Sequence, residues 1–403
     1  MLPNKRELRA VPVKAGPRSG ALQSMRSKTF RVQHGPGKTG HDRRGDGIVA
    51  PTVTYEAPGL PAGSSNLRPW ENILANVVGF GKDTVGGAGA ELYHVTNLND
   101  SGVGSLRAGA ESTTPYWIVF DVSGTITQST VLKIRSNKTI DGRGANVLIS
   151  SSGMEIGVWS VSDFVTDNVI IHNITFEEIT SNGGVIIGGA ASNIWIDHCT
   201  FHDATDELLF VGSDIGSAFP NGDIAPYGIT ISWCKWPTTT GGGGGGEAPG
   251  YGDKAVLISD PSSTQDADMT ITLHHNHYQA TYVRHPLCRW GKIHAFNNYL
   301  DRNVLGVQAG LNVQFYSEND IYKKHAGGVA LMLDSDIGGI EPGPSLYVKC
   351  IGEYLLSGAL VEERTPESIF NPSASYSYTA ETADDTLLAA VEAGSGWQDV
   401  ELP

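Results

Sequence analysis

Several features are scarce in this chain of 403 residues, and each scarcity excludes a class of protein. Only four cysteines occur and no Cys-x-x-Cys pair is present, so the chain is not a disulfide-stapled scaffold. No stretch approaches 18 apolar residues, so we expect no membrane-spanning helix. The N-terminus is charged but has no apolar stretch, so no ordinary secretory signal is visible.

Glycine is the residue that the sequence has in excess. It accounts for 50 of the 403 residues, which is about 12% against the roughly 7% of ordinary proteins. Charged residues make up only 18%. This balance is typical of a β protein with many turns and not of a helical bundle or a coiled coil.

Charge is distributed unequally along the chain. Residues 1–45 contain eleven Lys/Arg and two acids, a net charge of +9, whereas the rest contains 17 basic and 41 acidic residues, a net charge of −24. We therefore expect a basic extended arm or linker over 1–66 and one domain over 67–403. The acidic body argues against nucleic acid as a partner, and the arm either binds an acidic surface or is a solvated tail.

The acidic body repeats itself in short β-type segments. Five of these superpose without gaps at spacings of 25, 35, 42 and 21 residues: IHNITF (171–176), IDHCTF (196–201), ISWCKW (231–236), LHHNHY (273–278) and HAFNNY (294–299). A base period near 21–25 residues with occasional insertions indicates a solenoid, and several short strands per repeat indicate a β-helix. The predicted fold is all-β, a right-handed single-stranded parallel β-helix with short capping helices.

Stacked coils place equivalent side chains in ladders, because neighbouring strands lie about 4.8 Å apart. The superposition predicts two ladders. One consists of aromatic rings, and the other consists of side chains at a tight turn that point into the coil. In the second ladder we expect Cys199 and Cys234 to be stacked, reduced thiols. The members are Phe176, Phe201, Trp236, Tyr278 and Tyr299 for the first, and Ile174, Cys199, Cys234, Asn276 and Asn297 for the second. Short helices are expected at 70–77, at 103–110 behind Ser105, and from an N-cap at Thr382 to Gly394. The first and last of these are expected to cap the two ends of the solenoid.

Longer motifs resemble a known family over about residues 70–400. They include NIWIDHCTF (193–201), YGITISWCKW (227–236), MTITLHHNHY (269–278) and VRHPLCRWGKIHAFNNYL (283–300). The last holds an R-x-P-x-x-R-x-G signature, and together the motifs are similar to the pectate lyase family of polysaccharide lyases. The resemblance implies a pectin lyase-like β-helix that cleaves polygalacturonate, an acidic polysaccharide, by β-elimination.

The resemblance also implies roles for particular residues. Arg284 stands where the catalytic base acts. Lys254 and Arg289 match positions that hold substrate carboxylates, and we count Lys254 with Arg284 as catalytic and Arg289 as substrate-binding. These cations and Lys292 are expected to lie close together in adjacent coils. Asp197 and His198 match a motif near the groove, where either substrate binding or a structural turn would explain them.

Calcium is the cofactor that the resemblance implies, held by carboxylates. Where the family has one of these acids, this chain has Gly183-Gly184. The family's D-G-L-x-D motif corresponds to Asp206–Phe210 in this chain, which keeps the first acid, Asp206, but not the last. Glu207 is a further candidate ligand. Alternation along a strand would point Glu207 to the face opposite Asp206. With so few acids left, we expect Ca²⁺ dependence to be weak or absent.

Two functional classes remain open from the sequence. The first is a lyase that acts on an acidic polysaccharide outside cells, either secreted or carried on a virion. The second is a non-catalytic carbohydrate-binding or structural spike, such as a bacteriophage tail component, in which the basic arm would contact a virion or a homotrimer partner. Neither class needs nucleic acid or a membrane.

Overall fold

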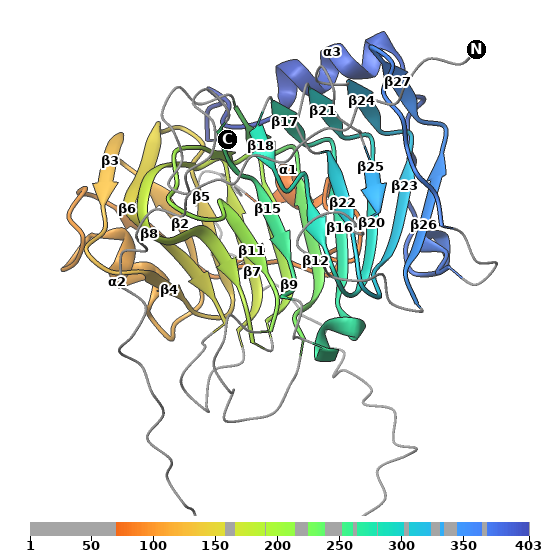
Figure 1. The fold of residues 1–403 in the computed structure, drawn as a ribbon. Coiled ribbons are helices and arrows are strands. Elements are labelled where there is room, and N and C mark those ends of the chain that lie inside the picture. Colours follow the sequence, from red (N-terminus) through yellow and green to blue (C-terminus); the bar gives the residue numbers. More distant parts are fainter. Residues whose placement is uncertain are drawn as a thin grey trace, which may run out of the picture. The chain divides into compact units, whose positions relative to one another are not determined.

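The computed structural model describes residues 70–157, 166–189, 191–213, 225–237, 252–260, 264–279, 281–301, 306–323, 331–333, 345–364 and 369–402. The chain divides into two units, 1–56 and 57–403, and all described residues belong to the second. The arm predicted over 1–66 therefore lies outside the described residues. Parallel strands stack side by side from β3 to β27, which confirms the parallel β-helix (Figure 1).

One face of the helix is a ten-stranded parallel sheet to which successive coils each give a strand. In spatial order its strands are β1 (Glu91–Val95), β2 (Tyr116–Phe120), β5 (Lys138–Asp141), β7 (Asp167–His172), β9 (Ser192–Asp197), β12 (Tyr227–Ser232), β16 (Thr270–His274), β20 (Lys292–Phe296), β23 (Gln314–Glu318) and β26 (Tyr347–Ile351).

The other two faces belong to one fifteen-stranded sheet. The long strand β8 (Thr175–Ile187) connects these two faces, because it pairs with β10 on one of them and with β11 on the other. One face holds β11 (Leu209–Val211), β15 (Val256–Ile258), β19 (Leu287–Cys288), β22 (Val307–Ala309) and β25 (Leu331–Leu333). The other holds β10 (Thr200–Phe201), β13 (Lys235–Trp236), β17 (His277–Gln279), β21 (Tyr299–Asp301), β24 (Ile321–Lys323) and β27 (Tyr354–Leu356). The first coils add β3 (Gly124–Thr127), β4 (Leu132–Ile134) and β6 (Val147–Ile156), and a separate pair is β14 (Gly252–Lys254) with β18 (Thr281–Val283).

The core runs along the inside of the coils. Apolar side chains repeat there in register, with Ile171 opposite Ile196, then Ile231 and then Leu273 in successive strands. All four are essentially fully buried. The strands are bonded to neighbours on both sides, so their ladder hydrogen bonds are satisfied within the stack.

The aromatic ladder is confirmed over its first four rungs. Ring centroids lie 4.9 Å apart for Phe176 and Phe201, 5.4 Å for Phe201 and Trp236, and 4.6 Å for Trp236 and Tyr278. The fifth rung is wrong. Tyr278 stands opposite Leu300, while Tyr299 stacks on His277 at 4.9 Å.

The inward-turning column is likewise confirmed except at its last member. Cys199 and Cys234 are buried free thiols, and burial, with Cys199 beside it, raises the pKa of Cys234 well above its ordinary value. Asn276 is followed by Asn298 and not by Asn297, because the backbone N–H of Asn276 donates to Asn298 Oδ1 at 3.0 Å. The true spacing at this coil is thus one residue longer than predicted.

In the described residues, three α-helices lie on the coils: α1 (Glu71–Leu74), α2 (Leu106–Ala110) and α3 (Asp385–Gly394), with 3₁₀ turns at Thr264–Asp268 and Pro372–Ala374. Ser105 caps α2 as predicted, since its side chain accepts from the Ala108 N–H. Thr382 is wrong as the cap of α3. Asp384 takes this role and accepts from the N–H groups of Thr386 and Leu387.

The capping of both ends by the first and last helices is also wrong. Ile73 of α1 packs on Trp117 and Ile170, along the side of several coils. Leu387 and Val391 of α3 pack on strands β21 and β24, where Figure 1 shows the helix lying across the strands. The helix that covers the first coil is α2, which packs against β1, β2 and β4. Of the helices in the described residues, none combines the length and apolar character that crossing a membrane requires.

Candidate functional site

Three neighbouring strands, β11, β15 and β19, carry charged residues just before they begin. Leu209 pairs with Val256, and Leu257 pairs with Leu287, so the three strands are in direct lateral contact. Because parallel strands start at the same edge, the residues ahead of them gather there. The residues that precede the three strands are Asp206 and Glu207, Lys254, and Arg284.

Two ion pairs connect these residues across the coils. Lys254 Nζ lies 3.1 Å from Asp206 Oδ1, and the Asp206 side chain is 54% exposed. Arg284 Nη1 contacts Glu207 Oε1, and here the side chains are only 20% and 10% exposed. Both carboxylates face the cations, so the expectation that Glu207 points away from Asp206 is wrong. The two residues precede β11, and strand alternation does not yet apply to them.

The backbone of Arg284 is held in an unusual conformation. Its φ is +69°, the left-handed region that side chains other than glycine rarely adopt. Its N–H donates to Gln308 Oε1 at 3.2 Å, and its carbonyl accepts from the Val256 N–H at 2.8 Å. Contacts from two neighbouring coils therefore fix the direction in which the guanidinium leaves the chain.

The electrostatic environment of Arg284 favours loss of its proton more than that of an ordinary arginine. Burial is the main cause that lowers the pKa of Arg284 to about 10; Asp206 opposes this shift and Arg289 adds to it. Arg289 thus belongs to the same group, and we call Lys254, Arg284 and Arg289 the cation cluster. Lys292 does not join it, because it lies on β20 in the ten-stranded sheet.

The described residues of this site do not fit a calcium ion. Calcium takes six to eight oxygen ligands, several of them carboxylates. Asp206 and Glu207 are both engaged by cations, and Phe210 lies in an apolar cluster with Ile186, Leu257 and Leu287. Among the residues that the structure describes, neither Asp206 nor Glu207 takes part in a group of three convergent ligand atoms.

Glycine at 183 and 184 is also required by the packing. A Cβ on Gly183 would lie 2.5 Å from the carbonyl oxygen of Glu207, and one on Gly184 would lie 2.6 Å from that of Leu208. An acidic residue at either position would displace the next coil.

The structure places Asp197 and His198 in a different cluster. Asp197 ends β9, in the ten-stranded sheet, and both residues line a cavity of about 930 Å³ together with Trp195, Trp233 and His275. No member of the cation cluster is among the described residues that line this cavity.

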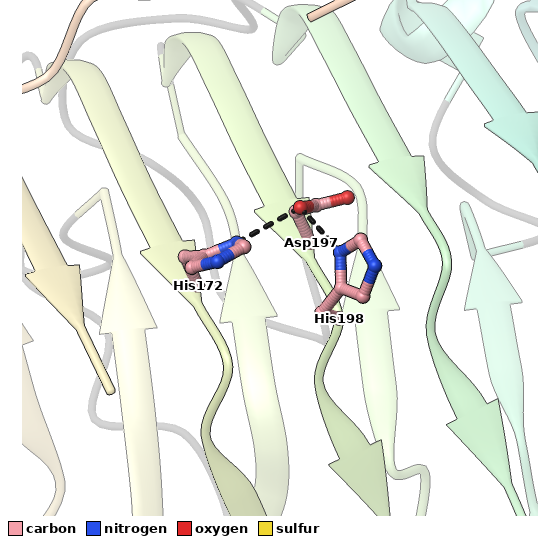
Figure 2. Close-up of side chains that lie close together, drawn as sticks. All are labelled: His172, Asp197 and His198. Carbon is pink, nitrogen blue, oxygen red and sulfur yellow. Dashed lines mark hydrogen bonds and ion pairs between the residues drawn. The ribbon is translucent and has the colours of Figure 1, made fainter. Parts of the chain in front are cut away.

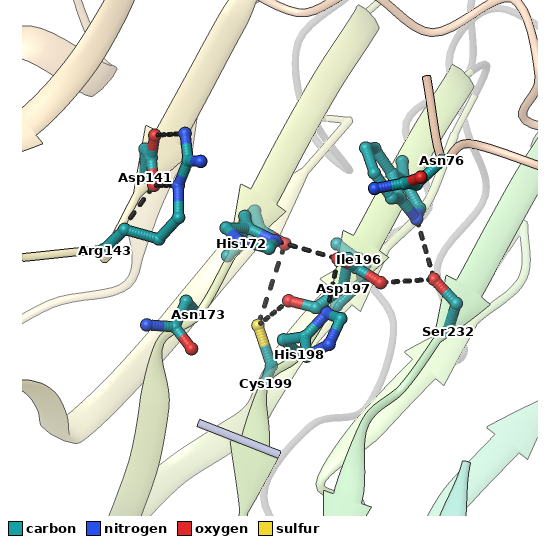
Figure 3. A network of polar contacts seen from close by, with 12 residues as sticks. Asn76, Asp141, Arg143, His172, Asn173, Ile196, Asp197, His198, Cys199 and Ser232 are labelled. Atoms are coloured by element: carbon teal, nitrogen blue, oxygen red, sulfur yellow. Dashed lines mark hydrogen bonds and ion pairs between the residues drawn. The ribbon is translucent and has the colours of Figure 1, made fainter. Parts of the chain in front are cut away.

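Asp197 is the centre of a buried hydrogen-bond network. Its Oδ2 lies 2.8 Å from His172 Nδ1 and 2.7 Å from His198 Nδ1 (Figure 2). On its other side, Ser232 Oγ donates to Asp197 Oδ1 at 2.6 Å (Figure 3). The same hydroxyl accepts from Trp195 Nε1 at 2.8 Å. Burial opposes ionisation, but His198 and His172 outweigh it and hold the pKa of Asp197 well below its usual value.

The buried polar atoms around Asp197 find their hydrogen-bond partners within the network. Burial lowers the pKa of His198, and the carboxylate of Asp197 outweighs burial and raises it. His172 Nδ1, Asp197 and His198 Nδ1 are close enough to form a metal-ligand triad, yet each of these atoms already has a hydrogen-bond partner at normal distance. The geometry therefore gives the cluster a complete structural role, joining three successive coils.

Sequence reasoning missed two of these partners although the repeats contained the signal. His172, Asp197 and Ser232 occupy the same position in IHNITF, IDHCTF and ISWCKW, and the observed register aligns them. Gln308, which holds Arg284, gave no signal, because an isolated glutamine carries no motif.

Comparisons with known proteins agree with this geometry. A family model described as pectate lyase matches residues 251–337. Pectate lyase 4 of Ambrosia artemisiifolia is 35% identical over 276 residues, which are 61% of this chain and 63% of the relative. Pectate lyase 1 of Cryptomeria japonica is 30% identical over 296 residues, covering 65% of this chain and 72% of the relative.

Solved structures show the same fold. The cedar pollen allergen jun a 1 superposes with a TM-score of 0.64 at 21% identity, covering 83% of this chain and 97% of the allergen. A pectate lyase from Bacillus sp. N165, solved with trigalacturonate, gives a TM-score of 0.55 at 21% identity and covers 80% and 98% of the two chains.

The matches are strong enough to assign the family, although the chain spans only 63% of the Ambrosia relative's length. The R-x-P-x-x-R-x-G signature lies within the matched region 251–337 and supplies Arg284 and Arg289 of the cation cluster. On the sequence relatives and the shared β-helix together, this chain belongs to the pectate lyase family.

Proposed function

We propose that this chain is a polysaccharide lyase that cleaves a galacturonate-containing polymer by β-elimination. The observation that carries the proposal is the cation cluster. Lys254 and Arg284 stand where β15 and β19 begin and Arg289 directly follows β19, on a body whose net charge outside residues 1–45 is −24. Relatives named pectate lyases support the enzyme over a non-catalytic spike.

The reaction asks two things of the protein. A cation must stabilise the uronate carboxylate while negative charge moves onto it from C5, and a base must remove the C5 proton. Lys254 and Arg289 would meet the carboxylate. Arg284 would take the proton, the C5–H electron pair would form the C4–C5 double bond, and the C4–O bond would break, its oxygen leaving with a proton from water.

Arg284 suits this role better than an arginine in water. A guanidinium normally has a pKa above 12 and is never a base at neutral pH. With the pKa lowered to about 10, about 1 molecule in 100 carries a neutral Arg284 at pH 8. The fixed backbone of Arg284 adds orientation, since a base must reach the proton along one direction.

Calcium would lend a second positive charge to the substrate carboxylate if it were bound. Asp206 and Glu207 are paired with cations and do not supply its ligands at this site, so every step above is assigned to the cation cluster. Asp206 is proposed to position Lys254 through their ion pair and to border the substrate.

The sequence also predicts substrate binding by Asp197 and His198, and this role has its own test. They line a separate cavity, so they would contact polymer only if a chain extends to it. A His198→Ala variant should then show a raised KM for long polymer, whereas an unchanged KM in the folded variant limits the cluster to structure.

Galacturonate-containing polysaccharides lie outside cells, so we expect the enzyme to act extracellularly. The virion and homotrimer partners predicted for the basic arm remain predictions of the sequence.

The test is a lyase assay on polygalacturonate, followed through the ultraviolet absorbance of the unsaturated product. Arg284→Ala should lose at least about 99% of kcat, in line with the 10²–10⁴-fold contribution of a general base, while thermal unfolding stays near that of the wild type. Lys292→Ala is the matched control, since Lys292 lies on the other sheet, and it should keep full activity. Near wild-type turnover by Arg284→Ala would overturn the assignment of the base.

A further inference from the structure

We propose that Glu207 is a positioning residue that keeps Arg284 paired and protonated in the resting enzyme, and that the polymer must loosen this contact before Arg284 can take a proton. The inference rests on the proposed lyase function and deepens it, because it assigns a control of the same site to a residue that departs from the family motif. Where the D-G-L-x-D pattern has glycine, this chain has Glu207.

Burial makes the contact with Arg284 the stronger of the two ion pairs. The side chains of Arg284 and Glu207 are 20% and 10% exposed, against 25% and 54% for Lys254 and Asp206. Charges that are withdrawn from water interact more strongly and are screened less by salt. Asp206 also favours the charged form of Arg284, but Glu207 is the carboxylate in direct contact with the guanidinium.

The backbone around Glu207 shows that its place is built and not accidental. Leu208, the next residue, is held on both sides: its N–H donates to the Lys254 carbonyl at 2.9 Å, and its carbonyl accepts from the Val185 N–H at 3.0 Å. Gly183 lies against the carbonyl of Glu207 with no room for a Cβ. The absence of a side chain at 183 thus leaves room for the backbone of Glu207 in the next coil.

Three elements bring charged side chains toward Arg284, and a fourth brings a neutral one. Glu207 and Asp206 precede β11, Lys254 precedes β15 and is paired with Asp206, and Arg289 follows β19 and repels Arg284. Gln308 on β22 is neutral and holds only the backbone of Arg284. Among the described residues, Glu207 is the one carboxylate in ion-pair contact with Arg284.

A carboxylate in contact with a guanidinium favours its protonated form. A base that must be neutral to act is then less available at a given pH, and the rate rises only toward alkaline pH. The ion pair also holds the guanidinium in one place, so that Arg284 is already oriented when the polymer arrives. Glu207 therefore lowers the activity at neutral pH and, at the same time, keeps the guanidinium of Arg284 ordered in the resting enzyme.

The test is the pH profile of kcat/KM on polygalacturonate for the full-length chain and its Glu207→Gln variant. Glutamine keeps the shape but loses the charge, so we expect the alkaline-rising limb to move down by about one pH unit and kcat/KM at pH 7 to rise roughly tenfold. Glu178→Gln is the control, because Glu178 is an exposed residue of β8, and its profile should match the wild type.

The outcomes separate this inference from the lyase proposal. A wild-type chain that cleaves no uronate polymer refutes the proposed function itself. An active wild type whose profile superimposes on that of Glu207→Gln overturns the role of Glu207. If Glu207→Gln does not fold, Glu207→Asp draws the carboxylate back by one carbon and should show a smaller shift in the same direction, and an unshifted profile there also overturns it.

Discussion

Removing the carboxylate of Asp197 is the perturbation that most directly tests how the coils are held together. Asp197 is buried and accepts hydrogen bonds from His172, His198 and Ser232 at 2.6 to 2.8 Å. The variant Asp197→Ala leaves these three donors in the interior without their acceptor. Breaking a buried charged contact in this way costs about 3–5 kcal/mol, and we expect about 4 kcal/mol here.

The chain offers a matched control on its surface. Asp121 makes the same kind of contact, with its Oδ1 2.8 Å from His94 Nδ1, but both side chains are about half exposed. Solvent replaces such a contact readily, so Asp121→Ala should cost about 0–1 kcal/mol. The assay is urea unfolding of both variants and the wild type, followed by circular dichroism at pH 7.

The sign of the pH dependence follows from the lowered pKa of Asp197. A carboxyl whose pKa is lower in the folded chain contributes stability above its unfolded pKa, near 3.8, and loses it as the pH falls toward the folded value. The difference between Asp197→Ala and the wild type should therefore shrink below about pH 4. An Asp197→Ala cost no larger than that of Asp121→Ala would refute the reasoning.

The remaining predictions concern metal, packing and the arm. A chelator should leave most of the lyase activity, because Asp206 and Glu207 are both paired with cations; complete loss that calcium reverses would show that other ligands in the chain complete a site. Gly183→Ala should destabilise the fold by about 1–3 kcal/mol, since its Cβ would lie 2.5 Å from the Glu207 carbonyl; an unchanged midpoint of thermal unfolding would contradict this. Removing residues 1–60 should leave the unfolding midpoint and lyase rate of the body unchanged, and unfolding of the truncated chain would move the domain boundary into the arm.

Repeated positions made much of the fold predictable. The spacing of IHNITF, IDHCTF and ISWCKW gave the correct register for three coils, and with it the stacked rings of Phe176, Phe201 and Trp236 and the stacked thiols of Cys199 and Cys234. The pattern succeeds because each inward position recurs once per coil and the interior accepts only apolar residues or polar ones that are hydrogen-bonded within the stack.

The register after β17 was not predictable from the same pattern. Two adjacent asparagines, Asn297 and Asn298, fit the inward column equally well on paper. The backbone decides between them, because Asn297 takes the left-handed turn conformation that His275 has one coil earlier, with φ of 56° and 54°. Asn298 then reaches inward to Asn276, and Tyr299 moves to the outer face.

The sequence predicted which cations form the site, but it did not predict which carboxylates pair with them. The signature named Arg284, Lys254 and Arg289, whereas the contact of Glu207 with Arg284 depends on where the chain turns before β11. A strand periodicity of two holds only inside a strand, so it gave the wrong side for Glu207.

The most direct measurement is the initial rate at which the full-length chain releases unsaturated uronate from polygalacturonate, compared with its Arg284→Ala variant under the same conditions. The proposed function predicts a steady rise of ultraviolet absorbance for the wild type and loss of at least about 99% of that rate in the folded variant. No unsaturated product from the wild type, or equal rates from both chains, would contradict it.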